Sequence, residues 1–210
     1  MTRLPREFFA RPVLDVTRDL LGAHVSHGGV TVRITETEAY AGDQDPGSHA
    51  FRGTTPRTAP MFGPAGVTYV YFTYGMHWML CLVTGEPGVA EAVLVRAGEV
   101  IEGQDIAQAR RPGIRERDWC RGPARLAKTL ALDGSHTDRD FCRPALGGPP
   151  PIELTVTAGI PVDRALVRTG PRVGVSGPGG DGTAYPWRFW IDAEPTVSAY
   201  RAGVIRRRGR

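Results

Sequence analysis

The order of apolar and polar residues predicts a helix followed by a hairpin in the first part of the chain. Apolar residues in the segment 13–21 recur at helical spacing between Pro12 and Gly22, and these two residue types favour the start and the end of a helix. Two glycines then separate the segments 23–27 and 30–40, whose composition is typical of strands. We therefore expect a helix that precedes a pair of strands.

A second hairpin is predicted around Tyr74 and Gly75. The flanking segments 67–73 and 76–83 are rich in tyrosine, threonine and valine, which suit the pleated surface of a strand. The tip of this hairpin is expected to be aromatic and apolar, although most aromatic residues in strands belong to a core. The other predicted elements are strands at 93–95, 155–160 and 187–191, a helix at 126–132, and loops at 42–66 and 143–151.

These elements indicate a mixed α/β (α+β) fold. Strands that are separated by hairpins and a few helices are typical of an antiparallel sheet with peripheral helices. With 210 residues, 27 glycines and 18 prolines, the chain is expected to form a single loop-rich domain over residues 1–200, followed by a basic tail at 201–210. We expect a curved antiparallel sheet from which the aromatic hairpin protrudes.

The charge of the chain is mildly basic and depends almost entirely on arginine. The formal net charge is +4, and Lys128 is the only lysine among 26 basic residues. Arginine forks suit phosphates and base edges, which favours a polyanionic partner. A genome rich in G and C produces the same bias without selection for binding, so the composition alone leaves both explanations open.

The cysteines and the apolar segments limit the location of the protein. Three cysteines without paired spacing argue against a disulfide framework and a thiolate zinc site, and they fit a reducing cytosol. The segment 1–14 has prolines and arginines within its apolar part, so it is not expected to be a secretory signal. The segment 58–85 is uncharged, but its prolines, glycines and polar side chains do not suit a membrane helix.

The strand predicted at 30–40 changes from apolar to acidic along one face. Because side chains alternate, Val30, Val32 and Ile34 share one face of the strand. Glu36, Glu38 and Tyr40 are predicted to follow them onto the same face. If that face is buried, two carboxylates about 7 Å apart lie in the interior, where an unpaired charge is costly. The pair is a candidate site, unless this end of the strand emerges into solvent or arginines neutralise both acids.

Three kinds of site fit these acids and their neighbours. Glu36, Glu38, Asp43, Asp45 and His49 offer oxygen and nitrogen ligands, but their spacing matches no metal motif. The two glutamates also suit an inverting sugar-cleaving enzyme, although neighbours on one strand do not easily flank a bond from opposite sides. In the third kind, nearby aromatic rings stack on a nucleobase. An acid beside such rings indicates cleavage of the glycosidic bond of a base that is rotated out of duplex DNA.

Motifs along most of the chain are similar to those of a known enzyme family. They are residues 33–40 (RITETEAY), 45–49 (DPGSH), 55–57 (TPR), 61–62 (MF), 69–76 (YVYFTYGM), 93–99 (VLVRAGE), 122–123 (GP), 172–175 (RVGV) and 186–189 (PWRF). With these motifs in order from about Phe8 to Ser198, the chain resembles the alkyladenine DNA glycosylases, also called methylpurine-DNA glycosylases. The resemblance implies a monofunctional enzyme that hydrolyses the N-glycosidic bond of alkylated purines, and an extension to deaminated purines is a further expectation.

The resemblance also implies catalytic roles for individual residues. Glu38 resembles the general base that activates a water against the sugar C1′. Arg96 and the backbone carbonyl of Val173 resemble the groups that help to hold this water. Glu36 belongs to the same motif and is expected to support the site by pairing with an arginine such as Arg33 or Arg96.

The resemblance further implies which residues bind the extruded base. Tyr40 resembles the ring that stacks on one face of the base, and His49 and Tyr71 resemble those on the opposite face. Cys81 stands where the family usually has an asparagine that disfavours the exocyclic amine of guanine. Because a thiol is smaller and a weaker hydrogen bonder than a carboxamide, we expect a pocket more open to guanine-derived lesions.

Other residues are expected to contact the DNA duplex. Tyr74 matches the side chain that enters the minor groove and fills the space left by the extruded base, which is a known way to unstack bases. Thr58 replaces an asparagine that is expected in the turn after Pro56. The other residues expected at the DNA are Thr55, Arg57, Met61 and Met76.

No metal and no cofactor is implied. The expected partner is double-stranded DNA that contains damaged purines, and the protein is expected to be a cytoplasmic, bacterial-type monomer that associates with the nucleoid while it acts and enters no membrane. Two alternatives stay open: a module that binds damaged or single-stranded DNA with impaired catalysis, and a glycosidase for nucleosides or sugars. A strong dependence on salt favours DNA over the small substrates.

Overall fold

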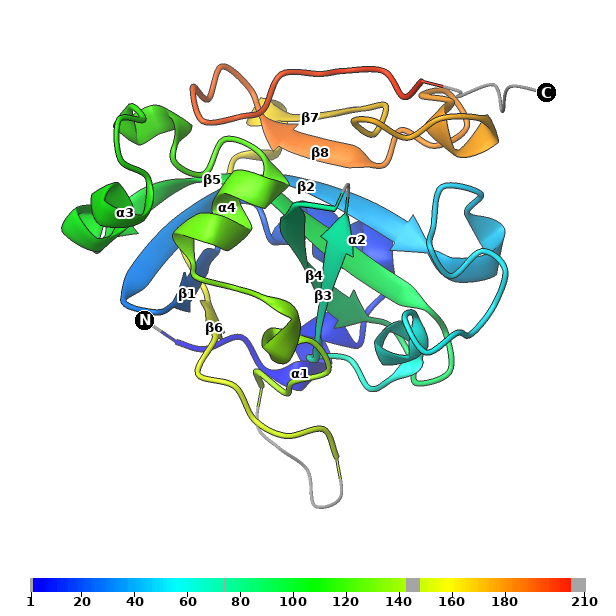
Figure 1. Ribbon diagram of the computed structural model, residues 1–210. Helices are drawn as coiled ribbons and strands as arrows, with labels where there is room; N and C mark the ends of the chain where they lie inside the picture. Colours follow the sequence, from blue (N-terminus) through cyan, green and yellow to red (C-terminus); the bar gives the residue numbers. More distant parts are fainter. Residues whose placement is uncertain (1, 74, 143–147, 205–210) are drawn as a thin grey trace.

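An antiparallel sheet dominates the fold (Figure 1). The computed structural model describes residues 2–73, 75–142 and 148–204, and the strands named here lie within them. They are β1 (His24–His27), β2 (Val30–Ala41), β3 (Thr68–Thr73), β4 (His77–Thr84), β5 (Glu91–Glu102), β6 (Thr155–Thr157), β7 (Val167–Gly170) and β8 (Arg188–Ile191). The order in the sheet is β3-β4-β5-β2-β1-β6, and β8 pairs with both β2 and β7. The mixed α+β single-domain fold is therefore confirmed.

Short helices and turns surround this sheet. The helices are α1 (Arg6–Phe9), α2 (Val13–Asp19), α3 (Gln104–Arg110) and α4 (Pro123–Thr129). Single 3₁₀ turns are η1 (Gly42–Gln44), η2 (Ala59–Phe62), η3 (Glu116–Asp118), η4 (Gly134–His136), η5 (Arg164–Leu166) and η6 (Pro178–Gly180). Over the described residues, no helix has the length and hydropathy needed to cross a bilayer. The described part of the uncharged segment 58–85 instead contributes η2, β3 and β4.

Most of the predicted elements are confirmed, with shifted ends. The helix predicted at 126–132 begins three residues earlier, because Pro123 occupies the first helical turn, where proline is well tolerated. The short strand predicted at 93–95 is the centre of the longer β5. Helices α1 and α3 and strand β7 were not predicted from the sequence, because they are short or have few apolar residues. The domain limits and the tail stay predictions, and residues 205–210 lie outside the described part.

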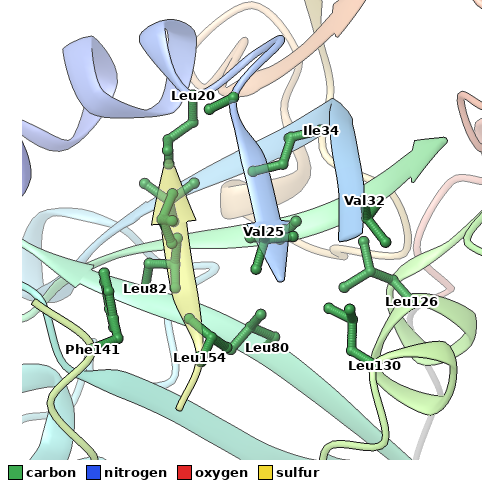
Figure 2. Close-up of a cluster of buried hydrophobic side chains, with 14 of the residues drawn as sticks. Leu20, Val25, Val32, Ile34, Leu80, Leu82, Leu126, Leu130, Phe141 and Leu154 are labelled. Atoms are coloured by element: carbon green, nitrogen blue, oxygen red, sulfur yellow. The ribbon is translucent and has the colours of Figure 1, made fainter. Parts of the chain in front are cut away.

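The main core lies between one face of the sheet and helices α2 and α4. Figure 2 shows leucine, valine and isoleucine side chains from several elements meeting in this layer. Each fully buried side chain of this size contributes roughly 1.5–3 kcal/mol relative to an exposed one. The labelled members of the core are Leu20, Val25, Val32, Ile34, Leu80, Leu82, Leu126, Leu130, Phe141 and Leu154.

The strands β3 and β4 pair as the sequence predicted. Their antiparallel register extends from the pair Thr68 and Leu82 to the pair Thr73 and His77. Tyr74, the predicted aromatic tip, lies outside the described residues. Whether an aromatic tip protrudes from this pair therefore stays a prediction.

The acidic residues of β2 do not share a face with the valines before them, so that prediction is wrong. The register with β5 shifts by one residue between Ile34 and Glu36, which leaves Thr35 as the extra residue of a β-bulge. A bulge reverses the alternation of side chains beyond it. Ala39 therefore packs in the same core as Ile34 although its number is odd, and Glu38 is directed to the other face of the sheet.

A smaller cluster covers this other face. It is formed by side chains of β3, β4 and β5 that alternate with those of the main core, and by residues of the long loop before β3. Its buried members are Ala50, Met61, Val67, Tyr69, Cys81, Val83, Ala90, Ala92 and Leu94. The bulge in β2 therefore brings the two glutamates to the layer that is also rich in tyrosine.

Candidate active site

A cavity of about 320 Å³ opens on the face of the sheet that carries the smaller cluster. This volume lies at the lower end of the range that is typical of small-molecule sites. Residues from β2, β3, β4 and β5 line it, together with the loop of residues 46–49, Met61 and the segment 173–176. Predicted site residues among them are Tyr40, His49, Met61, Tyr71, Cys81, Arg96 and Val173.

Glu38 adjoins this cavity with a fully buried carboxylate. Its Oε1 accepts the backbone N–H of Val173 at 2.6 Å, and its Oε2 accepts the Tyr40 hydroxyl at 2.9 Å and Nη1 of Arg96 at 3.2 Å. All three partners line the cavity. The contact with Val173 uses its N–H, whereas the role expected for its carbonyl stays a prediction.

Within the described part of the chain, the hydrogen bonds to Glu38 leave one acceptor position on its carboxylate. An ionised carboxylate has about four lone-pair sites, two on each oxygen. Tyr40 and Arg96 occupy both sites on Oε2, and Val173 occupies one on Oε1. One lone-pair site on Oε1 therefore has no donor among the described residues, while the three bonds fix the carboxylate.

Arg96 joins Glu38 to the second buried acid, Glu36. Nε of Arg96 donates to Oε1 of Glu36 at 3.0 Å, and Nε of Arg188 donates to the same oxygen at 2.6 Å. Ser198 adds its backbone N–H at 2.7 Å and its hydroxyl at 3.0 Å. Burial opposes the charge of Arg96, but the carboxylates of Glu38 and Glu36 raise its pKa above the ordinary value.

The expected pairing of Glu36 with an arginine is confirmed for Arg96. Arg33, the other arginine considered, instead pairs with Glu99 at 2.9 Å and with Glu194 at 2.6 Å. Two buried carboxylates thus face the two buried guanidinium groups of Arg96 and Arg188. Such compensation is what makes buried charges tolerable.

The guanidinium of Arg172 packs over the ring of Tyr40. Its guanidinium carbon lies 4.6 Å from the centroid of that ring. Nη1 donates to Oδ2 of Asp45 at 2.5 Å and to the carbonyl of Ala39 at 2.9 Å, and Nη2 donates to Oδ1 of Asp45 at 2.6 Å and to the carbonyl of Gly179 at 2.8 Å. The side chains of both Arg172 and Asp45 are 0% exposed. This ion pair therefore ties the start of the 46–49 loop to the segment that carries Val173.

Three further aromatic rings, those of His49, Tyr69 and Tyr71, line the cavity. The rings of His49 and Tyr71 meet edge to face at 4.7 Å, and Tyr71 stacks on Tyr69 at 5.2 Å. Nδ1 of His49 lies 3.1 Å from the Tyr69 hydroxyl. Desolvation and the positive charge of Arg57 lower the pKa of His49, which favours a neutral imidazole at pH 7. Burial raises the pKa of Tyr69 to about 12, so this hydroxyl also stays neutral.

Cys81 closes the inner end of the cavity. It is a free cysteine with 4% of its surface exposed, and it pairs with Tyr69 across β3 and β4. Burial, and then the carboxylate of Glu38, raise the pKa of this thiol. Cys81 is therefore an uncharged, weak hydrogen bonder at neutral pH.

The residues expected at the DNA surface occupy different environments. Met76 is 67% exposed beside the hairpin turn, and Arg57 lies over the ring of Tyr71 with its guanidinium carbon 5.6 Å from the centroid. Thr55 is exposed, and its backbone N–H donates to the Thr58 hydroxyl at 2.9 Å, so Thr58 closes this turn in place of an asparagine. Met61 is only 2% exposed and lines the cavity, which places it in the pocket wall rather than at the surface.

Several residues of the site were not found from the sequence. Arg172 and Arg188 are concealed by the general excess of arginine, and Ser198, which contacts Glu36 through its backbone N–H and its hydroxyl, has no distinctive sequence pattern. Asp45 was considered only as a metal ligand, whereas it pairs with Arg172. Among the residues that the structure describes, no three His, Cys, Asp or Glu side chains are grouped to hold a metal ion.

Comparisons with known proteins identify chains of similar sequence. The family model of methylpurine-DNA glycosylase matches residues 7–195. A protein of Streptomyces avermitilis is 54% identical over 99% of this chain and 96% of its own length. Proteins of Frankia casuarinae and Myxococcus xanthus are 47% and 45% identical, over 93% and 94% of this chain and 92% and 94% of their own lengths. Each of the three is named "Putative 3-methyladenine DNA glycosylase".

Proposed function

The chain belongs to the methylpurine-DNA glycosylase family, and from this premise we propose that it is a DNA-repair hydrolase that releases alkylated purines, such as 3-methyladenine, from duplex DNA. The reaction is hydrolysis of the N-glycosidic bond, and its products are a free base and an abasic site. The observation that carries the proposal is the buried carboxylate of Glu38, fixed by three donors beside an aromatic cavity.

Glu38 is the general base of this reaction. The unoccupied acceptor position on Oε1 takes a proton from the attacking water, and the water oxygen forms a bond to C1′ of the sugar. The C1′–N bond breaks, and its electron pair leaves with the purine. Alkylation at N3 or N7 makes the purine cationic, so it departs as a neutral base. Stabilisation of the positive charge on the sugar by the same carboxylate adds to general base catalysis, which is worth typically about 10² to 10⁴ in rate.

The cavity supplies the binding site for the extruded base. The ring of Tyr40 forms one wall, and the rings of His49 and Tyr71 form the other. Stacking against electron-rich rings favours a cationic purine, and a neutral His49 adds no repulsive charge. We assign to Tyr74, which lies outside the described residues, the role of filling the space that the base leaves in the duplex.

Replacement of Glu38 by glutamine tests this mechanism. The substitution keeps the size of the side chain but removes the proton acceptor. We expect base release in a single-turnover assay to fall by at least about 10² to 10⁴, with binding to lesion-containing duplex nearly unchanged. Glu86→Gln, which changes an exposed glutamate, is the matched control and should release base at the wild-type rate. Release by Glu38→Gln at the wild-type rate would remove Glu38 from its role.

The substrate class is tested separately, in chelator and without added metal. Duplexes that each contain one modified purine are incubated with the wild-type protein, and abasic sites are detected by alkaline strand cleavage. Activity on duplex DNA should fall steeply between about 50 and 200 mM salt, because phosphate contacts release counterions. Cleavage of free nucleosides with little dependence on salt would instead favour a small-substrate glycosidase, and binding without base release would indicate a binding module.

A further inference from the structure

A second and larger hollow lies between β4 and α4. We call it the α4 groove; its volume is about 810 Å³, and side chains from both elements line it. Helix α4 packs beside β4, as Figure 1 shows. Met79 lines both the groove and the catalytic cavity, so the two hollows share the strand β4.

The lining of the α4 groove is strongly basic. It includes Arg111, Arg121, Arg125 and Lys128, against a single carboxylate, Asp133. Oδ1 of that carboxylate already accepts hydrogen bonds from the backbone N–H and hydroxyl of Ser135 and pairs with His136 at 2.8 Å. The groove therefore has an excess of positive charge.

Neighbouring acids do not cancel this excess. Arg121 and Arg125 approach Asp118 at 3.5 and 4.0 Å, but the same carboxylate also pairs with Arg115 at 2.9 Å. Arg111 and Lys128 form no ion pair with any residue that the structure describes. A fixed cluster of like charges in a concave surface raises the local concentration of anions.

Arg111 is the strongest indication that the groove takes a ligand. Its Nε is buried and has no hydrogen-bond partner within the described part of the chain. Burial, and then the charge of Arg125, lower its pKa. An anion in the groove would supply the missing compensation.

We propose that the α4 groove binds the phosphodiester backbone of the DNA strand that flanks the extruded nucleotide. The proposal rests on the proposed function, because the cavity fixes where the DNA lies. Trp78 in the groove and Cys81 in the cavity are three residues apart on β4, which spans about 10 Å. Successive phosphates of one strand advance by about 3.4 Å along the helix axis, so the groove is within about three nucleotides of the lesion.

Substitution of the two unpaired cations tests the groove. The variants are Lys128→Ala and the double variant Arg111→Ala with Lys128→Ala, and Lys128→Arg retains the charge. Arg164→Ala, an exposed arginine of η5 outside the groove, is the matched control. The probe is a short duplex with one tetrahydrofuran abasic analogue, which has no glycosidic bond to cleave, and affinity is measured by fluorescence anisotropy from about 50 to 200 mM KCl.

The expected result is a smaller salt dependence. Each lost phosphate contact lowers the slope of log affinity against log salt by about 0.9, so Lys128→Ala loses about 0.9 and the double variant about 1.8. Across this fourfold range of salt, the ratio of the wild-type affinity to the Lys128→Ala affinity should fall about 3.5-fold. Lys128→Arg and Arg164→Ala should retain the wild-type slope. Lys128 is exposed, so its variants test the groove even if replacement of Arg111 disturbs the fold.

The position of the lesion in the duplex shows whether the groove contacts the flanking strand. With the analogue at the centre of the duplex, Lys128→Ala should bind more weakly than the wild type. With the analogue near one of the two ends, no DNA reaches the groove, and the two proteins should bind equally. Equal slopes for the wild type and Lys128→Ala, or an equal defect at all three positions, would overturn the proposal. If the wild type releases no purine, the proposed function fails; if it releases purine and the variants bind as the wild type does, only the groove proposal fails.

Discussion

The buried pair of Asp45 and Arg172 offers a sharp test of how the site is held together. Asp45→Asn keeps the shape of the side chain but removes its charge, and it leaves the guanidinium of Arg172 in the interior, where its exposure is 0%. Removal of one partner from a buried ion pair costs about 3–5 kcal/mol, because the other charge is left uncompensated. We therefore expect the free energy of unfolding to fall by about this amount.

The contacts of the pair support a value within that range. Asp45 accepts two bonds from Arg172, at 2.5 and 2.6 Å, and a third from the backbone N–H of Gly47 at 2.8 Å. An asparagine retains one oxygen and turns an NH₂ group toward the other guanidinium nitrogen. Among the residues that the structure describes, Nε of Arg172 has no hydrogen-bond partner, so no nearby acceptor replaces the contact that is lost.

Urea unfolding of matched variants measures this effect. Asp192→Asn, the control, breaks the pair of Arg168 and Asp192, whose side chains are 46% and 44% exposed, and should cost about 0–1 kcal/mol. The double variant of Asp45→Asn with Arg172→Met should be more stable than Asp45→Asn alone, because the buried charge is gone. If Asp45→Asn and Asp192→Asn lower stability equally, the reasoning is refuted.

Two further predictions concern the pocket itself. His49 has a lowered pKa in the folded chain, whereas its unfolded value is near 6.5, so the unfolded state binds the proton first as pH falls. The stability that this shift contributes is present above pH 6.5 and is lost as the pH falls below it. Between pH 7 and pH 5, the free energy of unfolding measured in urea should therefore fall less in His49→Gln than in the wild type. An equal fall in the two proteins would contradict the lowered pKa of His49. Cys81→Asn should reduce excision of methylated guanine relative to hypoxanthine, because a carboxamide opposes the exocyclic amine of guanine. Unchanged relative rates in single-turnover assays of both proteins would show that Cys81 does not set selectivity.

Local patterns were sufficient to predict much of the fold. The strands β1 and β2, the strands β3 and β4 and the helix α2 have glycines or a proline at their ends and apolar residues at the right period. The limits of β5 were missed because Arg96, Gly98 and Glu99 interrupt its apolar pattern, although all three lie within the strand. Helix α3 has mostly polar residues, and only Ala107 of that helix belongs to the main core.

Features that depend on distant pairing were not predictable in this way. The bulge at Thr35 arises from the register between β2 and β5, and nothing in the segment 30–40 alone indicates it. The partners of Glu38 lie 58 and 135 residues further along the chain, at Arg96 and Val173. The family resemblance supplied these residues, whereas the strand pattern indicated only that the acids needed partners.

The bulge explains how the carboxylate of Glu38 can be buried beside the cavity and still be paired in this fold. Without it, alternation would direct Glu38 into the leucine-rich core, where the cost of an unpaired charge favours protonation. With it, Glu38 reaches the layer that contains Arg96 and pairs with this arginine. Glu36 pairs with both Arg96 and Arg188, so two carboxylates compensate two guanidinium groups. Because one acceptor position on Oε1 remains, the network fixes the carboxylate without consuming its capacity to accept a proton. The same irregularity in the sheet thus accounts for the burial of the acid, its compensation and its access to the cavity.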